Sequence, residues 1–387
     1  MGTDASGVTI DEIEDMFNNK WFNDHDIFEN EDESSDIYLE NITLLHELRS
    51  TINENPTIFC PRLYQLIVKF FEVHIYESYS FKPAPVYEID MEEEETYITN
   101  KIAEKLASIE FIISIIDSPN FSVDEAKRII NIQFVYKILN SFYCEDIRIR
   151  DMLKNLLHKI YTKFLNMRGK IRNRIKIMFQ EIVATKALCR GLDQILDILS
   201  SIITGFVKPL KEEHKLLLKD GLVLLLKMPN LSQFDQKLSF ALMYFCEKDS
   251  DCLDIVLDSM LKYWPKTAPN KEQKFIYYLN ELLIRCEEES LNKFRERIMI
   301  QIRRCLKSDH CQLIEQTLKL MYESLQISRI IEFDTTKYLK QIIECRPDIK
   351  PEDWNGTLLC YFKELEELYA KKFGDAYYQA KSAAEHN

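Results

Sequence analysis

Cationic side chains are concentrated in one segment of the chain, residues 145–176. This segment holds ten Lys and Arg residues against three acidic residues, which gives it a net charge of +7. Lys and Arg donate charge-assisted hydrogen bonds to carboxylates and phosphates. Because a basic helix is often only a solvated surface, the spacing of the neighbouring residues must decide whether this segment binds an acidic partner.

Four residues of the basic segment are spaced as the face of a helix. His158, Tyr161, Leu165 and Arg168 follow one another at intervals of three, four and three residues. This spacing predicts one helix over 158–168 with all four side chains on the same side. An aromatic ring, an imidazole and a guanidinium on one face would suit a partner with both apolar and acidic groups.

The next helix but one, expected over 192–206, is apolar on more than one side. Ile198 and Ile202 lie four residues apart beside Asp197, outside the main stripe. A helix that is apolar nearly all round is either deeply buried or lines a groove. The main core stripe consists of Leu192, Ile195, Leu196, Leu199, Ile203 and Phe206.

Cationic residues also follow this apolar helix. Lys211 and His214 come directly after 205–210 and are three residues apart, so they are neighbours if the segment is helical. Apolar residues flanked by Lys, His and Arg would suit a short acidic peptide with apolar anchors, bound as a linear motif. Nucleic acid is the competing partner of a basic segment. The rest of the chain has no broad basic stripe, and its acidic N-terminus would repel phosphate, so we favour a peptide.

The elements that position these residues are expected to be helices. The chain has 8 Gly in 387 residues, where average usage would give about 27, and sheet folds need Gly at many turns. Breakers such as 118–120, 208–209, 228–230 and 264–266 separate stretches of about 15 to 25 residues. Two such helices form a unit of about 40 residues, the size of a HEAT-type repeat. We therefore predict an all-α, HEAT-like or armadillo-type helical-repeat solenoid, an α-α superhelix whose long surfaces bind other proteins.

Charge divides the chain into regions. Residues 1–40 hold 13 acidic residues and one basic residue, so they carry −12 of the total net charge of −13. We expect a flexible acidic N-terminal arm over 1–40, a solenoid over 41–375 with an acidic loop at 78–96, and a C-terminal tail over 376–387. The first six residues also match the pattern for myristoylation of Gly2.

Several classes of function are disfavoured by missing motifs. The chain has no glycine-rich phosphate loop, Gly-x-Ser-x-Gly, His-Glu-x-x-His or Cys-x-x-Cys sequence. The ten cysteines are scattered among apolar neighbours, which favours free buried thiols over disulfides or a metal site. No apolar stretch is long enough to span a membrane. We expect no catalytic residues, no metal and no cofactor.

Several segments resemble the B-prime (B′) regulatory subunits of protein phosphatase 2A. The resemblance is strong over about 110–285 and weaker but collinear over about 41–110 and 286–375, including Trp354 and Asn355. The acidic arm lies outside it. The matching segments are SPNF at 118–121, EDIRIRD at 145–151, HKIYTKFLNMR at 158–168, LDILSSIITGF at 196–206, PLKEEHK at 209–215, FCEKD at 245–249 and YWPKT at 263–267.

The resemblance implies a non-catalytic regulatory subunit of the cytoplasm and nucleus. Such a subunit joins the phosphatase scaffold and catalytic subunits, and it recruits Ser/Thr-phosphorylated substrates through a groove for Leu-x-x-Ile-x-Glu-type acidic peptides. Two groove positions depart from the family, which has Arg where this chain has Lys159 and Glu where it has Asp197. The alternative is another helical-repeat adaptor, such as a nuclear transport receptor. The groove residues implied are His158, Lys159, Tyr161, Arg168, Asp197, Ile198, Ile202, Phe206, Lys211 and His214.

Overall fold

The structure is a computed structural model that describes residues 8–22, 31–76, 100–345 and 356–385. Over these residues the chain is helical and contains no β-strand, which confirms the predicted all-α fold. The chain divides into two compact units, residues 1–199 and 200–387. The predicted acidic loop at 78–96, Gly2 and the pair Trp354 and Asn355 lie outside the described residues.

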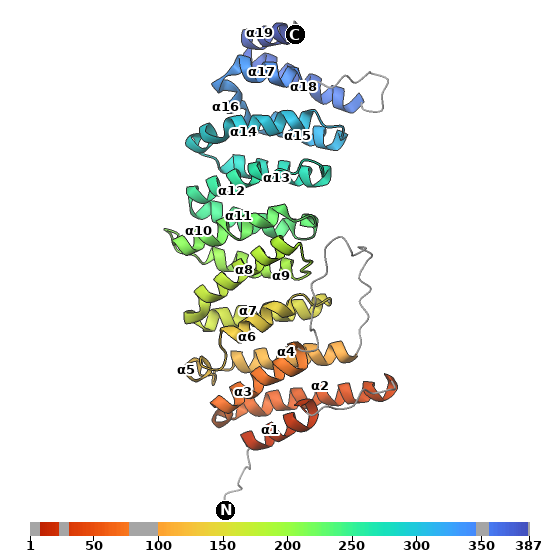
Figure 1. Cartoon of the computed structure of the whole chain (residues 1–387), viewed down its shortest axis with the longest axis vertical. Coiled ribbons are helices and arrows are strands. Elements are labelled where there is room, and N and C mark those ends of the chain that lie inside the picture. The colour runs from red at the N-terminus through yellow and green to blue at the C-terminus, as the bar shows by residue number, and fades with distance from the viewer. Residues whose placement is uncertain (1–7, 23–30, 77–99, 346–355, 386–387) are drawn as a thin grey trace, which may run out of the picture. The chain divides into compact units, whose positions relative to one another are not determined.

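The first unit is a stack of helices in two layers (Figure 1). In one layer α2 packs against α4 and α4 packs against α7, while α6 packs against η3 and α8 in the other. The elements are α1 (Ile10–Phe17), η1 (Asn18–Phe22), α2 (Glu31–Glu54), η2 (Pro56–Ile58), α3 (Pro61–Phe70), η3 (Phe71–Tyr76), α4 (Asn100–Asp117), α5 (Val123–Ala126), α6 (Ile132–Ser141), α7 (Ile147–Lys163), η6 (Leu165–Met167) and α8 (Arg168–Thr185). Helix α9 (Leu192–Thr204) begins in this unit.

The second unit repeats the same arrangement. Helices α11, α13, α15 and α18 pack in sequence as one layer, and α10, α12 and α14 pack in sequence as the other. The elements are α10 (Glu212–Lys219), η7 (Leu222–Lys227), η8 (Leu231–Gln233), α11 (Asp235–Lys248), α12 (Ser250–Lys262), α13 (Pro269–Arg285), α14 (Glu288–Leu306), α15 (Cys311–Glu323), α16 (Leu325–Phe333), α17 (Thr335–Ile343), α18 (Gly356–Phe373) and α19 (Asp375–Glu385). Alternating helices of two layers are the architecture of a helical-repeat protein.

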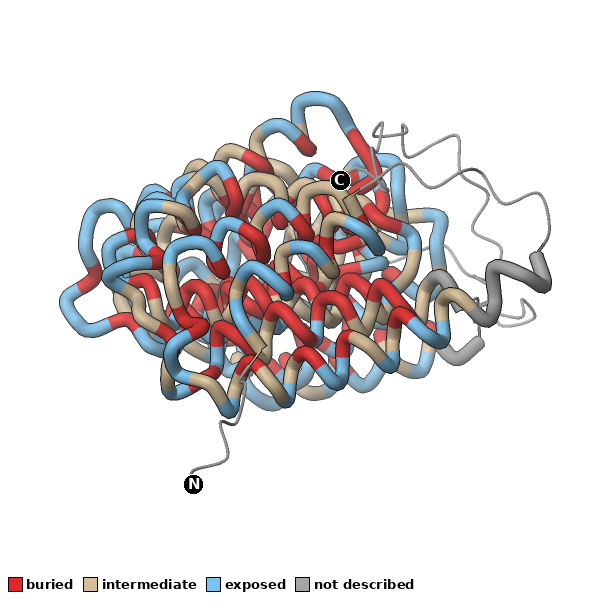
Figure 2. Tube along the Cα trace, turned by 90° about the horizontal axis from the view of Figure 1, so that it is seen from below, coloured by how far each residue is buried: buried red, intermediate tan, exposed pale blue. Residues whose placement is uncertain are grey.

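The breakers in the sequence act as helix caps. Asp249 ends α11 and its carboxylate accepts a hydrogen bond from the backbone N–H of Asp251, so it also begins α12. Pro269 is the first residue of α13, where its missing N–H costs nothing. Buried and exposed residues alternate along the trace of the described helices (Figure 2), because a spacing of three and four residues keeps apolar side chains on the face toward the next layer.

The structure differs from the prediction of a flexible arm over part of 1–40. Residues 10–22 are helical, and the side chain of Phe17 is fully buried. Its ring packs edge-on against Phe70 with centroids 4.9 Å apart, and the indole N–H of Trp21 donates to Oε1 of Glu104 at 3.0 Å. The aromatic residues interspersed among the acidic ones therefore dock this segment on the first unit.

The predicted C-terminal tail also differs from the structure. Residues 375–385 form helix α19, which packs on α17. Tyr377 and Ala380 are buried in that contact, so the helical stack extends beyond residue 375.

Candidate functional site

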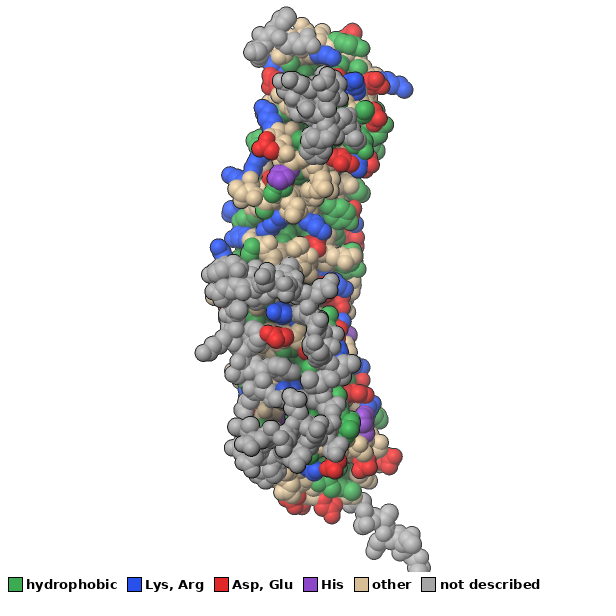
Figure 3. Space-filling model, turned by 90° about the vertical axis from the view of Figure 1, so that its right-hand side faces the viewer, with side chains coloured by type: hydrophobic (Ala, Val, Ile, Leu, Met, Phe, Trp, Pro, Cys, Tyr) green, Lys and Arg blue, Asp and Glu red, His purple; other side chains and the backbone are tan. Residues whose placement is uncertain are grey.

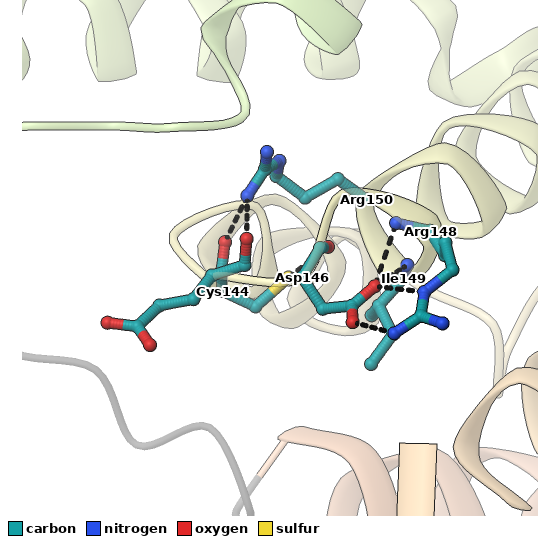
Figure 4. A network of polar contacts seen from close by, with 6 residues as sticks. Cys144, Asp146, Arg148, Ile149 and Arg150 are labelled. Atoms are coloured by element: carbon teal, nitrogen blue, oxygen red, sulfur yellow. Dashed lines mark hydrogen bonds and ion pairs between the residues drawn. The ribbon is translucent and has the colours of Figure 1, made fainter. Parts of the chain in front are cut away.

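The basic segment, residues 145–176, forms the connection into α7, all of α7, the turn that follows it and the first half of α8. Helix α7 begins after Asp146, whose carboxylate accepts hydrogen bonds from the backbone N–H groups of Arg148 and Ile149. The Arg148 guanidinium folds onto the same carboxylate, with Nη2 2.6 Å from Oδ2 (Figure 4). Hydrogen bonding from Arg148 lowers the pKa of Asp146. This cluster is a helix cap that uses one of the ten cations.

Arg150 has a structural role as well. Its side chain is 5% exposed, and its guanidinium donates to the backbone carbonyls of Cys144 and Glu145 (Figure 4). Farther along, Arg174 pairs with Glu181 at 3.0 Å. The net charge of the segment therefore overstates the number of cations that are available to a partner.

The prediction of one helix over 158–168 is wrong. Helix α7 ends at Lys163, because Phe164 leaves helical geometry with φ −97° and ψ 78°, and a 3₁₀ turn leads into α8 at Arg168. Phe164 is fully buried, whereas Leu165 is 67% exposed. At this turn the Phe164 ring packs edge-on against Phe121, with centroids 6.0 Å apart, and Leu165 is left at the surface.

Arg168 nevertheless reaches Tyr161 across this turn. Its Nε donates to the Tyr161 carbonyl at 2.9 Å, its Nη2 donates to the Thr162 carbonyl at 3.1 Å, and its guanidinium lies 5.2 Å from the Tyr161 ring centroid. Arg172, one turn later in α8, donates to the Tyr161 hydroxyl at 2.8 Å. Tyr161 is thus fixed at both ends by guanidinium groups. Sequence reasoning missed Arg172, although its position four residues after Arg168 places it on the same face of α8.

Lys159 and Asp197, the two departures from the family pattern, are held in ion pairs within the first unit. Lys159 Nζ lies 2.6 Å from Oδ2 of Asp117, and Asp197 Oδ2 accepts a hydrogen bond from Lys154 Nζ at 3.2 Å. His158 is half-buried on α7. Asp117 and Lys154 are partners that sequence reasoning did not identify, since each lies on another helix.

Helix α9 carries the two predicted isoleucines. Ile198 is 3% exposed and Ile202 is 6% exposed, whereas Ile195, Leu196, Leu199 and Ile203 are at 0%. The sequence left two possibilities for this helix, deep burial or the lining of a groove. The exposed fractions correspond to burial, and Ile198 and Ile202 keep only a small exposed edge.

The segment after α9 lies in the second unit. The imidazole of His214 stacks on the Phe206 ring, with centroids 3.8 Å apart and an interplanar angle of 2°. His214 is 7% exposed, whereas Lys211 is exposed at the N-cap of α10. Lys211 is therefore open to a partner, whereas the Phe206 ring covers one face of the His214 imidazole.

Lys248 also contacts the backbone that follows α9. Lys248, at the end of α11, donates through Nζ to the carbonyls of Thr204 at 2.7 Å and Phe206 at 3.0 Å. These carbonyls follow the last turn of α9, where backbone oxygens lack intrahelical donors. Lys248 therefore fixes the position of Phe206, and only the FCEKD segment at 245–249 had marked it.

Comparison with known proteins shows which family the chain belongs to. The sequence profile of the family described as "Protein phosphatase 2A regulatory B subunit (B56 family)" matches residues 6–371. The chain belongs to this B56 family. The human and mouse serine/threonine-protein phosphatase 2A 56 kDa regulatory subunits alpha are each 32% identical to it over 374 residues, which cover 95% of this chain and 76% of theirs. The rat beta isoform is 31% identical over 86% of this chain and 67% of its own.

Membership of the B56 family confirms the predicted non-catalytic role. The relatives are named as regulatory subunits of a phosphatase, so this B56 subunit is a phosphatase regulator rather than an enzyme. The alternative of a nuclear transport receptor is thereby set aside. In the described part of this B56 subunit, no group of three or more His, Cys, Asp and Glu residues is placed to hold a metal ion. None of its described helices has the length and apolar character needed to cross a membrane.

Proposed function

We propose that this B56 subunit binds the phosphatase 2A scaffold and catalytic subunits and recruits Ser/Thr-phosphorylated substrates to them. Recruitment would use short acidic peptides of the Leu-x-x-Ile-x-Glu type. The observation that carries the proposal is the Tyr161 cluster, in which Arg168 and Arg172 hold an aromatic ring beside two guanidinium groups. Tyr161 is only 8% exposed and Arg168 is half-buried, so the peptide would contact the edge of the ring and the guanidinium, and a prearranged contact of this kind costs little entropy on binding.

The apolar side chains of the peptide would contact Ile198, Ile202 and Phe206. Their exposed fractions are 3%, 6% and 8%. We therefore expect the Leu and Ile of the motif to lie across the exposed edges of these side chains rather than to enter a deep pocket. The flat stack of Phe206 on His214 supports such a surface because it is rigid.

The acidic side chains of the peptide would be bound by Lys211, Arg168 and His158. A hydrogen bond to a charged group contributes about 1.5–3 kcal/mol when it is desolvated, and less at an exposed lysine. Because Lys211 is exposed, we assign it a contribution below this range, about 1 kcal/mol, which corresponds to about fivefold in affinity.

The two departures from the family would alter specificity rather than abolish binding. Lys159 keeps the positive charge but not the bidentate geometry of Arg, and its pairing with Asp117 already occupies the amine. Asp197 keeps the charge of Glu on a shorter side chain and pairs with Lys154. We expect weaker recognition of a phosphate next to the motif than an Arg at position 159 would give.

The test is peptide binding to the full chain by fluorescence anisotropy. Lys211→Glu should weaken binding of a Leu-x-x-Ile-x-Glu peptide at least about tenfold. Lys219→Glu, which makes the same charge change at the other end of α10, should leave the affinity nearly unchanged. Equal affinities of wild type and Lys211→Glu would refute the site.

Association with the core is tested separately. Purified scaffold and catalytic subunits should form a stoichiometric complex with the chain in size-exclusion chromatography. The Lys211→Glu variant should form the same complex, because one exposed side chain contributes little to an interface large enough for a stable complex. Failure of the wild-type chain to join the core would contradict the first half of the proposal.

A further inference from the structure

A second cationic surface lies in the C-terminal unit, remote in sequence from the residues assigned to peptide binding. An open cleft of about 620 Å³ lies where the connection between α12 and α13 meets the end of α14. Its lining includes the cations Lys266, Arg303, Arg304 and Lys307. In Figure 3, Lys and Arg side chains are frequent along one edge of the upper half, which is this unit.

Hydrogen bonds and an ion pair connect the residues at and beneath the cleft. Trp264 is 4% exposed and its indole N–H donates to Oε1 of Glu272 at 3.2 Å. Arg304 donates through Nη2 to the Lys266 carbonyl at 3.0 Å and lies 3.8 Å from the same Glu272 oxygen. Arg304 therefore compensates Glu272 and fixes the loop that carries Lys266.

The other three cations are not compensated in this way. Among the described residues, Lys266, Arg303 and Lys307 form no ion pair. The Arg303 side chain hydrogen-bonds the Cys345 thiol, a weak partner, and its Nε atom is buried without a hydrogen-bond acceptor. Asp309 is the one remaining carboxylate in the described lining. The charges of Arg304 and Glu272 cancel, and the remaining three cations and Asp309 give the cleft a net charge of about +2. This charge is opposite and similar in size to the charge of about −1.5 to −2 on a phosphorylated side chain.

Two helix N-termini add to the positive potential of the cleft. Helix α13 begins at Pro269 and α15 begins after His310, and both residues line the cleft. Neither helix has a side-chain N-cap hydrogen bond. The N-terminus of a helix carries a partial positive charge and unsatisfied N–H groups, which favour an anion.

We propose that this cleft is a phosphate-binding site that takes a phosphoserine or phosphothreonine of a protein recruited to the phosphatase. The guanidinium of Arg303 and the amines of Lys266 and Lys307 would bind the phosphate oxygens. This inference rests on the proposed recruiting function and adds a second contact to it, one that reads phosphorylation rather than the Leu-x-x-Ile-x-Glu sequence.

A protein segment fits the cleft better than a small isolated anion does. The cleft is open, and Lys266, Lys307 and His310 at its border are exposed, so a chain can pass across it while one side chain enters. Ile300 supplies an apolar surface in the same lining. The lining cations would bind a phosphate without hydrolysing it. The site would therefore hold a substrate through one phosphorylated residue while the phosphatase acts on another.

The test uses the full chain and a short fluorescein-labelled peptide that contains two phosphoserines but no Leu or Ile. The double variant Arg303→Ala with Lys307→Ala should lose at least about tenfold in affinity. The matched control is Arg297→Ala with Lys293→Ala, which removes one Arg and one Lys from the same helix, where they pair with Asp258 and Asp254 outside the cleft. This control should bind the peptide like wild type.

Further arms separate this site from the proposed peptide site. Lys211→Glu should bind the phosphopeptide normally, and the cleft variant should bind a Leu-x-x-Ile-x-Glu peptide normally. Equal loss in both double variants, equal binding of a peptide with Glu in place of phosphoserine, or no binding by wild type would each overturn the proposal. Binding to vesicles that contain phosphatidylserine, without binding to the phosphopeptide, would also overturn it by indicating a membrane surface instead.

Discussion

The imidazole of His214 lies flat on the ring of Phe206, with centroids 3.8 Å apart and planes that differ by 2°. Lys248 holds the Phe206 carbonyl at 3.0 Å, and Phe245 lies 6.0 Å from the Phe206 ring. The end of α9 and the start of α10 are thus joined through one aromatic stack. His214 acts in this arrangement as a flat ring, and its contribution to binding should follow from its shape more than from its charge.

This stack predicts different outcomes for two substitutions of His214. His214→Phe keeps an aromatic ring over Phe206 and should retain most of the stability and most of the affinity for a Leu-x-x-Ile-x-Glu peptide. His214→Ala removes the stacked ring, which contributes about 0.5–1.5 kcal/mol beyond its buried area, and should lower both. Urea unfolding and peptide anisotropy measure the two effects. A His214→Phe variant that is stable but does not bind would show that the imidazole itself contacts the peptide.

Gly191 predicts a strong effect of one added methyl group. A Cβ at this position would lie 2.5 Å from the carbonyl oxygen of Phe142, a backbone atom that cannot move away cheaply. Gly191→Ala should therefore destabilise the first unit by about 1–3 kcal/mol, measured by urea unfolding. Gly205→Ala is the matched control, since its nearest contact would be 3.4 Å, from the Ile202 carbonyl oxygen. Equal stability of the two variants would contradict the close approach at Gly191.

The N-cap of α7, Asp146, should contribute measurably to the free energy of unfolding. Asp146→Ala removes the acceptor for two backbone N–H groups and the partner of Arg148. The expected loss is about 1 kcal/mol, with Asp146→Asn costing less because an amide oxygen can still cap the helix. Thermal unfolding of the three proteins checks the order. If Asp146→Asn were as unstable as Asp146→Ala, the ion pair with Arg148 would matter more than the cap.

The sequence predicts the helical-repeat fold because its signals are local. Scarce glycine, three- and four-residue apolar spacing and breakers such as 228–230 and 264–266 are all read within one or two turns. The position of α9 and its core stripe were predicted for the same reason. In such a fold each helix follows from its local sequence and packs on helices that are near it in the sequence. Long-range contacts therefore have little influence on the architecture.

The site could be predicted in its residue types but not in its geometry. The spacing of His158, Tyr161 and Arg168 gave no sign that α7 would end at Lys163, because the same spacing is compatible with a helix that continues. The same limit applies to His214, whose burial depends on the stack with Phe206. The partners Asp117 and Lys154 lie on other helices, and no sequence spacing connects them to Lys159 and Asp197.

Buried thiols predict how stability changes in alkaline solution. Burial raises the pKa of Cys144, Cys189 and Cys305 to about 12, whereas an unfolded thiol loses its proton near pH 8.5. Between these values the unfolded chain binds fewer protons than the folded one, so stability is fully present below about pH 8.5 and falls as pH rises. Each thiol can contribute a slope of up to about 1.4 kcal/mol per pH unit.

Lys271 changes the pH dependence of stability in the direction opposite to the thiols, so variants of the two residue types should shift the alkaline response in opposite ways. Burial lowers the pKa of its amine, which donates to the Met228 carbonyl, to about 8. Between that value and about 10.4 the unfolded lysine binds more protons, so this residue adds stability as pH rises. Urea midpoints of the reduced protein should therefore fall from pH 8 to pH 10. They should fall less steeply in Cys189→Ala and more steeply in Lys271→Met. Identical slopes in all three proteins would mean that these buried groups do not control the alkaline response.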